Sequence, residues 1–169
     1  MKVIIEKLTN IDLAHKAIQY TTGHRFTPKA PLNKIYRWEH SITRTQMFTI
    51  EMIQIPTYIS VHFVRHKIGV EHFVQSNRED RGGEKTANRH TPVDHLMLLN
   101  AEALINISHR RLCYQASEET RNVMLMIKDT MKNVDLDLYE MLVPKCFYRN
   151  GICSEPKHCG KYPVKHFVI

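Results

Sequence analysis

The order of the hydrophobic patterns along the chain is the strongest constraint on its fold. Residues 2–6 and 47–55 are rich in β-branched and alternating apolar residues, which predicts strands. Residues 10–20 and 117–132 carry apolar residues at helical spacing, which predicts helices. The stripe that the second helix should bury consists of Val123, Met124, Ile127 and Met131. Strands that come mainly before helices predict an α+β domain.

Two further segments contain conflicting patterns. Residues 56–66 begin with Pro56, which suits the first turn of a helix, but the apolar residues that follow alternate, so we predict a strand. From Thr91 a capping hydroxyl, a proline and an acidic residue come in the order typical of a helix start. We therefore expect a helix over residues 91–114. The polar, glycine-containing residues 79–90 predict a loop.

The 169 residues suit one domain, which we place at residues 1–143, with a cysteine-containing tail at 144–169. The longest apolar runs fall far short of the roughly 18 residues that span a membrane. The segment after Met1 lacks the apolar run of a secretory signal, so we expect a cytoplasmic protein. The net charge of +7 favours anionic partners such as nucleotides, phosphorylated cofactors or nucleic acid, although it also serves solubility.

The cysteines are concentrated near the C-terminal end. Three of the four lie in the tail with the spacing C-x6-C-x5-C, as Cys146, Cys153 and Cys159, and the fourth is Cys113. With His158 or His166 as a fourth ligand, the tail cysteines are a candidate zinc site. The spacing lacks the close C-x2-C pair typical of zinc ligands, so we favour free thiols and no bound metal.

Two segments group cations in a way that suits phosphate binding. Arg65, His66 and Lys67 follow a nearly continuous apolar run, although charges at a helix end also offset the helix dipole. Ser76 and Arg78 occupy a polar turn whose side chains and backbone amides could hold a phosphate. The alternative for this turn is a surface ion pair between the arginine and a nearby acid.

A third polar group lies in residues 100–116. At 100° per residue, Asn100, Arg111 and Gln115 would share one face of a continuous helix within about 60°. A polar face on an otherwise apolar helix suits a polar ligand or a partner subunit, and a salt-bridged surface is the alternative.

Together these segments resemble the flavin-dependent thymidylate synthase (ThyX) family. Trp38-Glu39-His40-Ser41 is similar to the family's His-x-Ser/Thr segment, and Phe48-Thr49 is similar to its F-T-F strand. Arg65-His66-Lys67 and Ser76-Asn77-Arg78 are similar to parts of its R-H-R-x-x-S-x-N-E-x-S-x-R motif. Its later helices resemble Asn100-Ala-x-Ala-Leu-x-Asn106 and Arg111-Leu-x-x-x-Ala116-x-x-Glu119-Thr120-Arg121. The similarity covers about residues 38–125.

The resemblance implies a fold and an activity. The fold would be an antiparallel twisted sheet flanked by helices, and the assembly a homotetramer with active sites at subunit junctions. The enzyme would be a methyltransferase that carries FAD and moves a one-carbon unit from methylenetetrahydrofolate to C5 of dUMP, with NADPH as reductant. Clustered cations suit such phosphorylated and acidic ligands.

The resemblance also implies roles for individual residues. The flavin would contact His40, Arg65, His66, Lys67, Asn100 and Asn106. The nucleotide would contact His62, Arg65, Ser76, Arg78, Arg89 and Arg111, with Ser76 and Arg78 on its phosphate. Arg111, at the uracil, and Ser76 would be the catalytic residues.

Two alternatives stay open. A pyrimidine nucleotide hydroxymethylase could use the same fold and ligands. A non-catalytic nucleic-acid-binding module would explain the charge and the tail but not the ordered pattern of Arg65, Arg78 and Arg111, so we do not expect a nucleic-acid partner. Steep salt dependence of oligonucleotide binding would support the second alternative.

Overall fold

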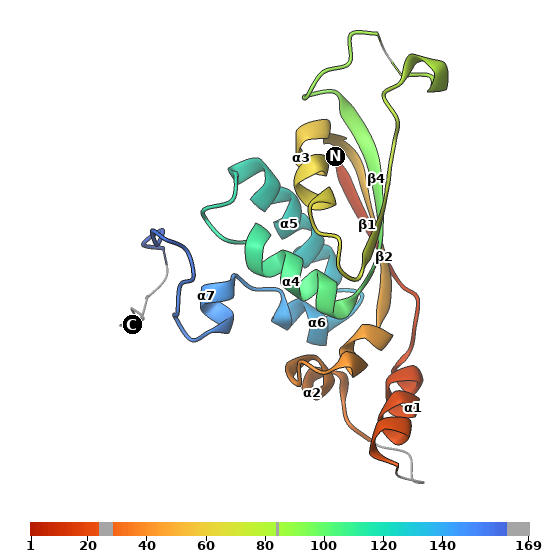
Figure 1. The fold of residues 1–169 in the computed structure, drawn as a ribbon, viewed down its shortest axis with the longest axis vertical. Helices are drawn as coiled ribbons and strands as arrows, with labels where there is room; N and C mark the ends of the chain where they lie inside the picture. The colour runs from red at the N-terminus through yellow and green to blue at the C-terminus, as the bar shows by residue number, and fades with distance from the viewer. Residues whose placement is uncertain (24–28, 84, 162–169) are drawn as a thin grey trace.

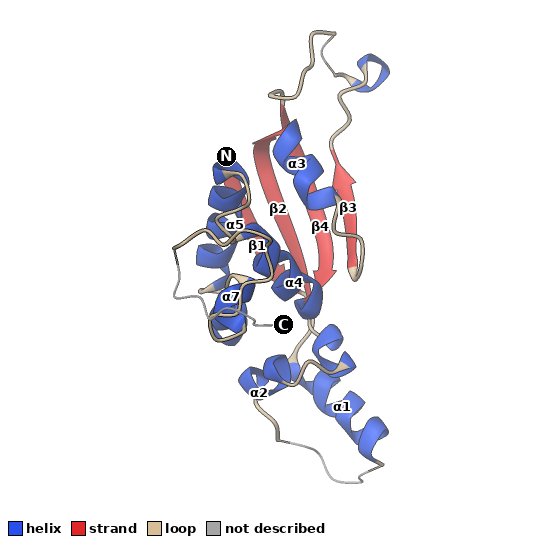
Figure 2. Ribbon diagram, turned by 60° about the vertical axis from the view of Figure 1, so that its left-hand side comes forward, coloured by secondary structure: helices blue, strands red, loops and turns tan. Residues whose placement is uncertain are grey.

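A four-stranded sheet in the order β1-β2-β4-β3 forms the centre of the computed structural model, which describes residues 1–23, 29–83 and 85–161. The strands are β1 (Lys2–Lys7), β2 (Met47–Pro56), β3 (Val70–Val74) and β4 (Pro92–Asn100). Each neighbouring pair is antiparallel. The expected α+β class, an antiparallel sheet flanked by helices, is confirmed (Figure 2).

Three helices cover the same face of this sheet: α3 (Thr57–Val64), α4 (Ala101–Arg111) and α5 (Glu118–Met131). Figure 1 views the sheet nearly edge-on, with these helices on one side. Alternate residues of β2 are buried because a strand turns every second side chain to the same face. α5 buries the predicted stripe of Val123, Met124, Ile127 and Met131.

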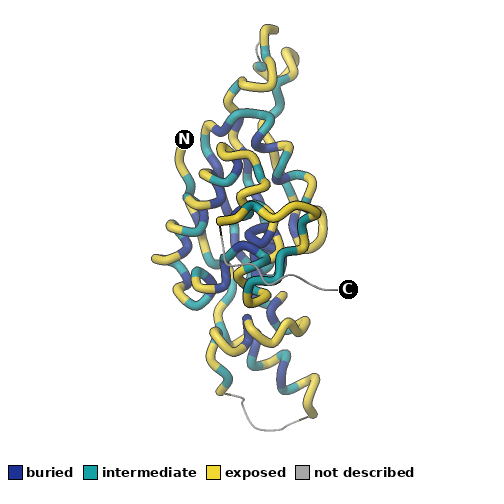
Figure 3. Tube along the Cα trace, turned by 90° about the vertical axis from the view of Figure 1, so that its left-hand side faces the viewer, coloured by how far each residue is buried: buried dark blue, intermediate teal, exposed yellow. Residues whose placement is uncertain are grey.

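A smaller helical layer lies at one end of the molecule. It comprises α1 (Ile11–Thr22), α2 (Leu32–Arg37) and the 3-10 helix η1 (Ser41–Thr45). Ala14, Ile18 and Ile35 form its own buried cluster. Figure 3 shows buried stretches in this layer, in its lower part. Two short helices complete the fold: α6 (Leu136–Met141) packs against α2, and α7 (Lys145–Tyr148) packs against α4.

The predicted strand at residues 56–66 is wrong, because α3 follows directly on β2 there. Ile59 and Phe63, four residues apart, are buried on one side of this helix, whereas Val61 is 47% exposed. Pro56 precedes the first helical residue with φ −56°, where the missing N–H costs no helical hydrogen bond. The alternation of apolar residues in this segment therefore does not reflect a strand.

The predicted helix over residues 91–114 is wrong in its first half. Residues 92–100 form β4, and α4 begins at Ala101. Pro92 opens the strand, a position where proline is tolerated. The residues of β4 that are buried in alternation are Val93, His95, Met97 and Leu99. The helix cap is Asn100, whose side chain accepts a hydrogen bond from a backbone N–H of the first turn at 2.9 Å.

The connection from β3 to β4 extends beyond the sheet at the end opposite α1 (Figures 1 and 2). It contains one short 3-10 helix, η2 (Glu79–Arg81), so the loop expected at residues 79–90 is confirmed. Among the described residues, no helix combines the length and the apolar character needed to cross a membrane.

Candidate functional site

The C-terminal ends of α3 and α4 meet at Arg111. Its Nη2 donates a hydrogen bond to the backbone oxygen of His62 at 2.5 Å, and its Nε donates to Nε2 of His66 at 3.0 Å. Because the guanidinium is planar, these two bonds fix its orientation between the helix ends. Arg65, at the end of α3, is exposed beside this junction.

His66 is a neutral imidazole at this junction. Burial, and then the charge of Arg111, lower the pKa of His66 to about 4. Its Nε2 accepts from Arg111, so the ring proton of the neutral form lies on Nδ1. Burial, followed by Arg65 and Arg110, also lowers the pKa of Arg111. The junction therefore concentrates positive charge, which an anionic ligand would relieve.

A chain of hydrogen bonds supports His66 from the sheet. Nε2 of His72 donates to the backbone oxygen of His66 at 2.6 Å, and Nδ1 of His72 lies 2.9 Å from Nε2 of His95. The other nitrogen of His95 lies 3.1 Å from Oγ of Ser60 on α3. Burial, and then His72, lower the pKa of His95 to about 4. Ser60, His95 and His72 thus form one line of hydrogen bonds that ends at the backbone of His66.

A cleft of about 480 Å³ opens beside His66. This volume lies within the range of small-molecule sites. Arg110, Lys145 and Arg149 line the cleft. Burial, followed by Lys145, Arg149 and Arg110, lowers the pKa of His109 at the same cleft to about 4. The three cations outnumber the two carboxylates of the lining, Glu39 and Glu102, so the cleft wall has a net positive charge.

A second hollow adjoins this cleft. His66 and Arg110 line both. The second hollow is also lined by Arg111, Cys113, Gln115, Ala116 and Glu155. The acidic residue Glu102 on the cleft wall forms an ion pair with Arg44, so part of its charge is already matched.

Ser76 and Arg78 do not reach these hollows within one chain. Both lie in the β3–β4 connection, outside the residues that line the cleft and the adjoining hollow. The Nε and Nη2 of Arg78 donate to both carboxylate oxygens of Asp80, at 2.9 and 2.7 Å, on the surface. The surface ion pair considered from the sequence is thus present.

The predicted common helix face of Asn100, Arg111 and Gln115 is wrong, because the helix is shorter than expected. Asn100 caps α4, and Gln115 lies beyond its end, where its Nε2 donates to the backbone oxygen of Lys157 at 2.8 Å. Asn106 is exposed on α4 and lines the cleft. Four other residues predicted to contact the flavin or the nucleotide have exposed side chains: His40, Arg65, Lys67 and Arg89.

Sequence reasoning missed the cations of the cleft wall. Lys145 and Arg149 are four residues apart around a short helix, and Arg110 lies on the facing helix α4. The four-residue spacing was visible in the sequence and indicates side chains on one helix face. Their meeting with Arg110 depends on how α7 packs on α4.

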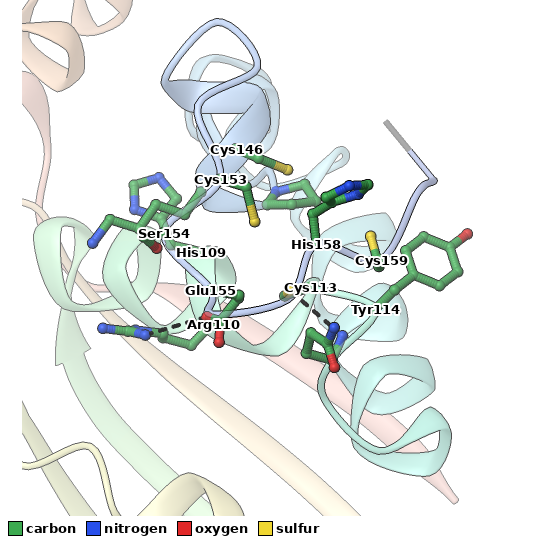
Figure 4. A pocket seen from close by; sticks show the side chains of 13 residues that line it. His109, Arg110, Cys113, Tyr114, Cys146, Cys153, Ser154, Glu155, His158 and Cys159 are labelled. Carbon is green, nitrogen blue, oxygen red and sulfur yellow. Dashed lines mark hydrogen bonds and ion pairs between the residues drawn. The ribbon is translucent and has the colours of Figure 1, made fainter. Parts of the chain in front are cut away.

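All four cysteines line one pocket between the end of α4, α7 and the tail (Figure 4). Sequence spacing did not group Cys113 with the three tail cysteines. His158 lines the same pocket, whereas His166 lies outside the described residues. The cysteines are free, and within the described ranges no three His, Cys, Asp or Glu side chains stand where they could hold a metal ion.

Comparison with known proteins identifies the architecture. No protein-family profile and no curated protein sequence matches the chain. Two crystal structures of thymidylate synthase ThyX from Helicobacter pylori with FAD and dUMP resemble it, with TM-scores of 0.64 and 0.66 at 16% identity. They match 84% and 85% of this chain and 97% and 100% of their own. The chain has a ThyX fold. The fold implied by the dispersed ThyX-like motifs is thereby confirmed.

Proposed function

We propose that the protein is a flavin-dependent enzyme of the thymidylate synthase type. It transfers a one-carbon unit from methylenetetrahydrofolate to C5 of dUMP, with FAD as cofactor and NADPH as reductant. Residues 1–143 form its catalytic domain, and the tail adds the cations Lys145 and Arg149 to the cleft. The ThyX fold supports this function. The observation that carries it is the junction where neutral His66 and the cations Arg110 and Arg111 line adjoining hollows.

The cleft suits the diphosphate of a dinucleotide. Arg110, Lys145 and Arg149 supply positive charge, and the volume of about 480 Å³ admits a small-molecule ligand. We assign the flavin contacts to His40, Arg65, His66, Lys67 and Asn106. Asn100 acts indirectly, because its side chain caps α4. Bound FAD, once reduced by NADPH, would supply the hydride that completes the methyl group.

We assign the dUMP phosphate to Ser76 and Arg78. A homotetramer would bring this loop from a neighbouring subunit to the hollow of Arg111 and so complete the site. The phosphate replaces Asp80 as the partner of Arg78, since it offers more charge and accepts both N–H groups of the guanidinium. The remaining nucleotide contacts are assigned to His62, Arg65 and Arg89.

Arg111 stabilises the charge that develops on the uracil ring as C5 forms its new bond. Two hydrogen bonds hold its guanidinium in place before the substrate binds, so little reorganisation is needed during the reaction. Half-burial strengthens this electrostatic effect relative to water. Ser76, the second proposed catalytic residue, donates its hydroxyl proton in a hydrogen bond to the nucleotide.

An assay with dUMP, methylenetetrahydrofolate, NADPH and FAD, followed by mass analysis of the nucleotide, tests the proposal. We expect dTMP; a 5-hydroxymethyl product would favour the hydroxymethylase alternative. Arg111→Lys keeps the charge but loses the planar fork, so it should lower kcat strongly. The control is Arg121→Lys, which makes the same change at an arginine that stacks on Tyr114, 4.5 Å from the ring centroid, and should leave kcat unchanged.

Binding measurements separate this proposal from a nucleic-acid function. The native oligomer should take up FAD and bind dUMP saturably. If neither ligand binds and oligonucleotide affinity falls steeply with salt, the enzymatic proposal is wrong and the nucleic-acid alternative is favoured.

A further inference from the structure

All the cysteines of this chain meet at one pocket. Cys113 follows the end of α4, Cys146 lies in α7, and Cys153 and Cys159 lie in the tail. Figure 4 shows their side chains around the same space. Cys113 is far from the other three in the sequence, so the fold brings it there. Four thiols from separate segments form a potential ligand set that the tail spacing alone does not reveal.

The tail has little hydrophobic packing to hold it in place. Residues 149–161 form no helix and contain a single branched aliphatic side chain. Its contacts include the hydrogen bond from Gln115 to Lys157 at 2.8 Å and the ion pair of Arg110 with Glu155 at 3.6 Å. Exposed ion pairs contribute less than about 1 kcal/mol. A metal cross-link would add stability to a segment of this kind.

We propose that Cys113, Cys146, Cys153 and Cys159 bind one Zn²⁺ as thiolates and attach the tail to α4 and α7. Thiolate sulfur is a preferred zinc ligand, and four of them complete the tetrahedral coordination of a structural site. Binding replaces four S–H bonds with four Zn–S bonds and releases four protons. The resulting centre carries a charge of −2.

Zinc binding requires the sulfur atoms to move inward. Within the described part of the chain no three ligands are yet arranged to hold a metal ion. The ion would draw each sulfur to about 2.3 Å. Cys153 and Cys159 lie in irregular chain, which can adjust without breaking a helix or the sheet.

The surrounding charges suit such a centre. Arg110 and Lys145 line the same pocket as the cysteines, and Arg149 follows α7 directly. These cations would partly offset a charge of −2, and Glu155, which lines the same pocket and pairs with Arg110, would oppose it. The three cations also line the cleft beside His66, so the metal would hold in place the wall to which we assign the FAD diphosphate. The zinc site itself does not depend on the proposed function.

Metal analysis of the full chain, purified under reducing conditions without chelators, tests this proposal. We expect one zinc per chain. Replacement by Co²⁺ should produce the intense sulfur-to-metal charge-transfer bands and the d–d bands of a tetrahedral thiolate site. Cys113→Ser and Cys153→Ser should each lose the metal. Ser154→Ala, which changes another residue of the pocket lining, should retain it.

The wild-type measurement decides the question even if a cysteine variant fails to fold. A chain without zinc that gives no cobalt spectrum overturns the proposal, whether its cysteines are free thiols or disulfides. Full zinc content in Cys113→Ser also overturns the four-thiolate site. These readouts are independent of activity: a zinc-containing protein that binds neither FAD nor dUMP would refute only the proposed function.

Discussion

The buried histidines predict that the protein loses stability in mild acid. His95 and His109 are 1% and 8% exposed, and the pKa of each is lowered to about 4, mainly by burial. In an unfolded chain histidine titrates near pH 6.5. Between these values the unfolded state binds protons that the folded state excludes. The free energy of unfolding is therefore unaffected above about pH 6.5 and falls as the pH drops toward 4.

The size of this effect follows from the two pKa values. Each histidine lowers the free energy of unfolding by about 1.4 kcal/mol per pH unit within the window, or about 2 kcal/mol at pH 5. His95 and His109 together should therefore remove about 4 kcal/mol between pH 8 and pH 5. His66 acts in the same direction. This loss is a large part of the stability of about 5–15 kcal/mol that is typical of a domain.

Urea unfolding at a series of pH values between 8 and 5 measures the loss. In His95→Gln the decrease should be smaller by about 2 kcal/mol, because one titrating group is gone. Met97→Leu, a change of similar volume at a buried neighbour on β4, should shift the free energy of unfolding equally at every pH. A free energy of unfolding that stays constant from pH 8 to pH 5 would refute the assignment of neutral buried rings.

Three further substitutions test particular contacts. Gly69→Ala should destabilise the protein by about 1–3 kcal/mol in urea unfolding, because φ is +72° and the added Cβ would lie 2.6 Å from the Asn100 side chain. An unchanged urea midpoint of unfolding would contradict this. Asp135→Ala should lower the free energy of unfolding by about 3 kcal/mol, because the carboxylate accepts a hydrogen bond from the buried Tyr36 hydroxyl at 2.7 Å and caps α6. A loss below about 1 kcal/mol would show that these two hydrogen bonds contribute little. Arg78→Ala should weaken dUMP binding by about 2 kcal/mol in calorimetry, and unchanged affinity would place the phosphate elsewhere.

Elements with a local signal were predictable. Asn10 caps α1, because its side-chain oxygen accepts a hydrogen bond from the backbone N–H of Asp12, as its position before an apolar stripe indicates. The stripe of α5 has helical spacing, and one face of that helix is buried. In these segments the residues that determine the structure lie within a few positions of one another.

Elements with two plausible local patterns were decided by their neighbours. Thr91 and Pro92 resemble a helix start, but Pro92 pairs with Pro56, and residues 93–100 continue along β2 as one of the two inner strands. Residues 57–64 are apolar on several faces, so their period could not distinguish strand from helix. Strand pairing within the sheet determined the structure of the first segment, and packing over the sheet determined that of the second.

The sequence by itself determined the order of the motifs, the concentration of cations and thiols, and the ThyX-like fold that they imply. Only the tertiary structure decided which groups meet: Arg111 with His66, Lys145 with Arg110, and Cys113 with the tail cysteines. It also separated Arg78 from this junction. The physical reason is one of range, since helical and strand periods depend on residues a few positions apart. A site depends on which helix ends and loops the packed sheet places together.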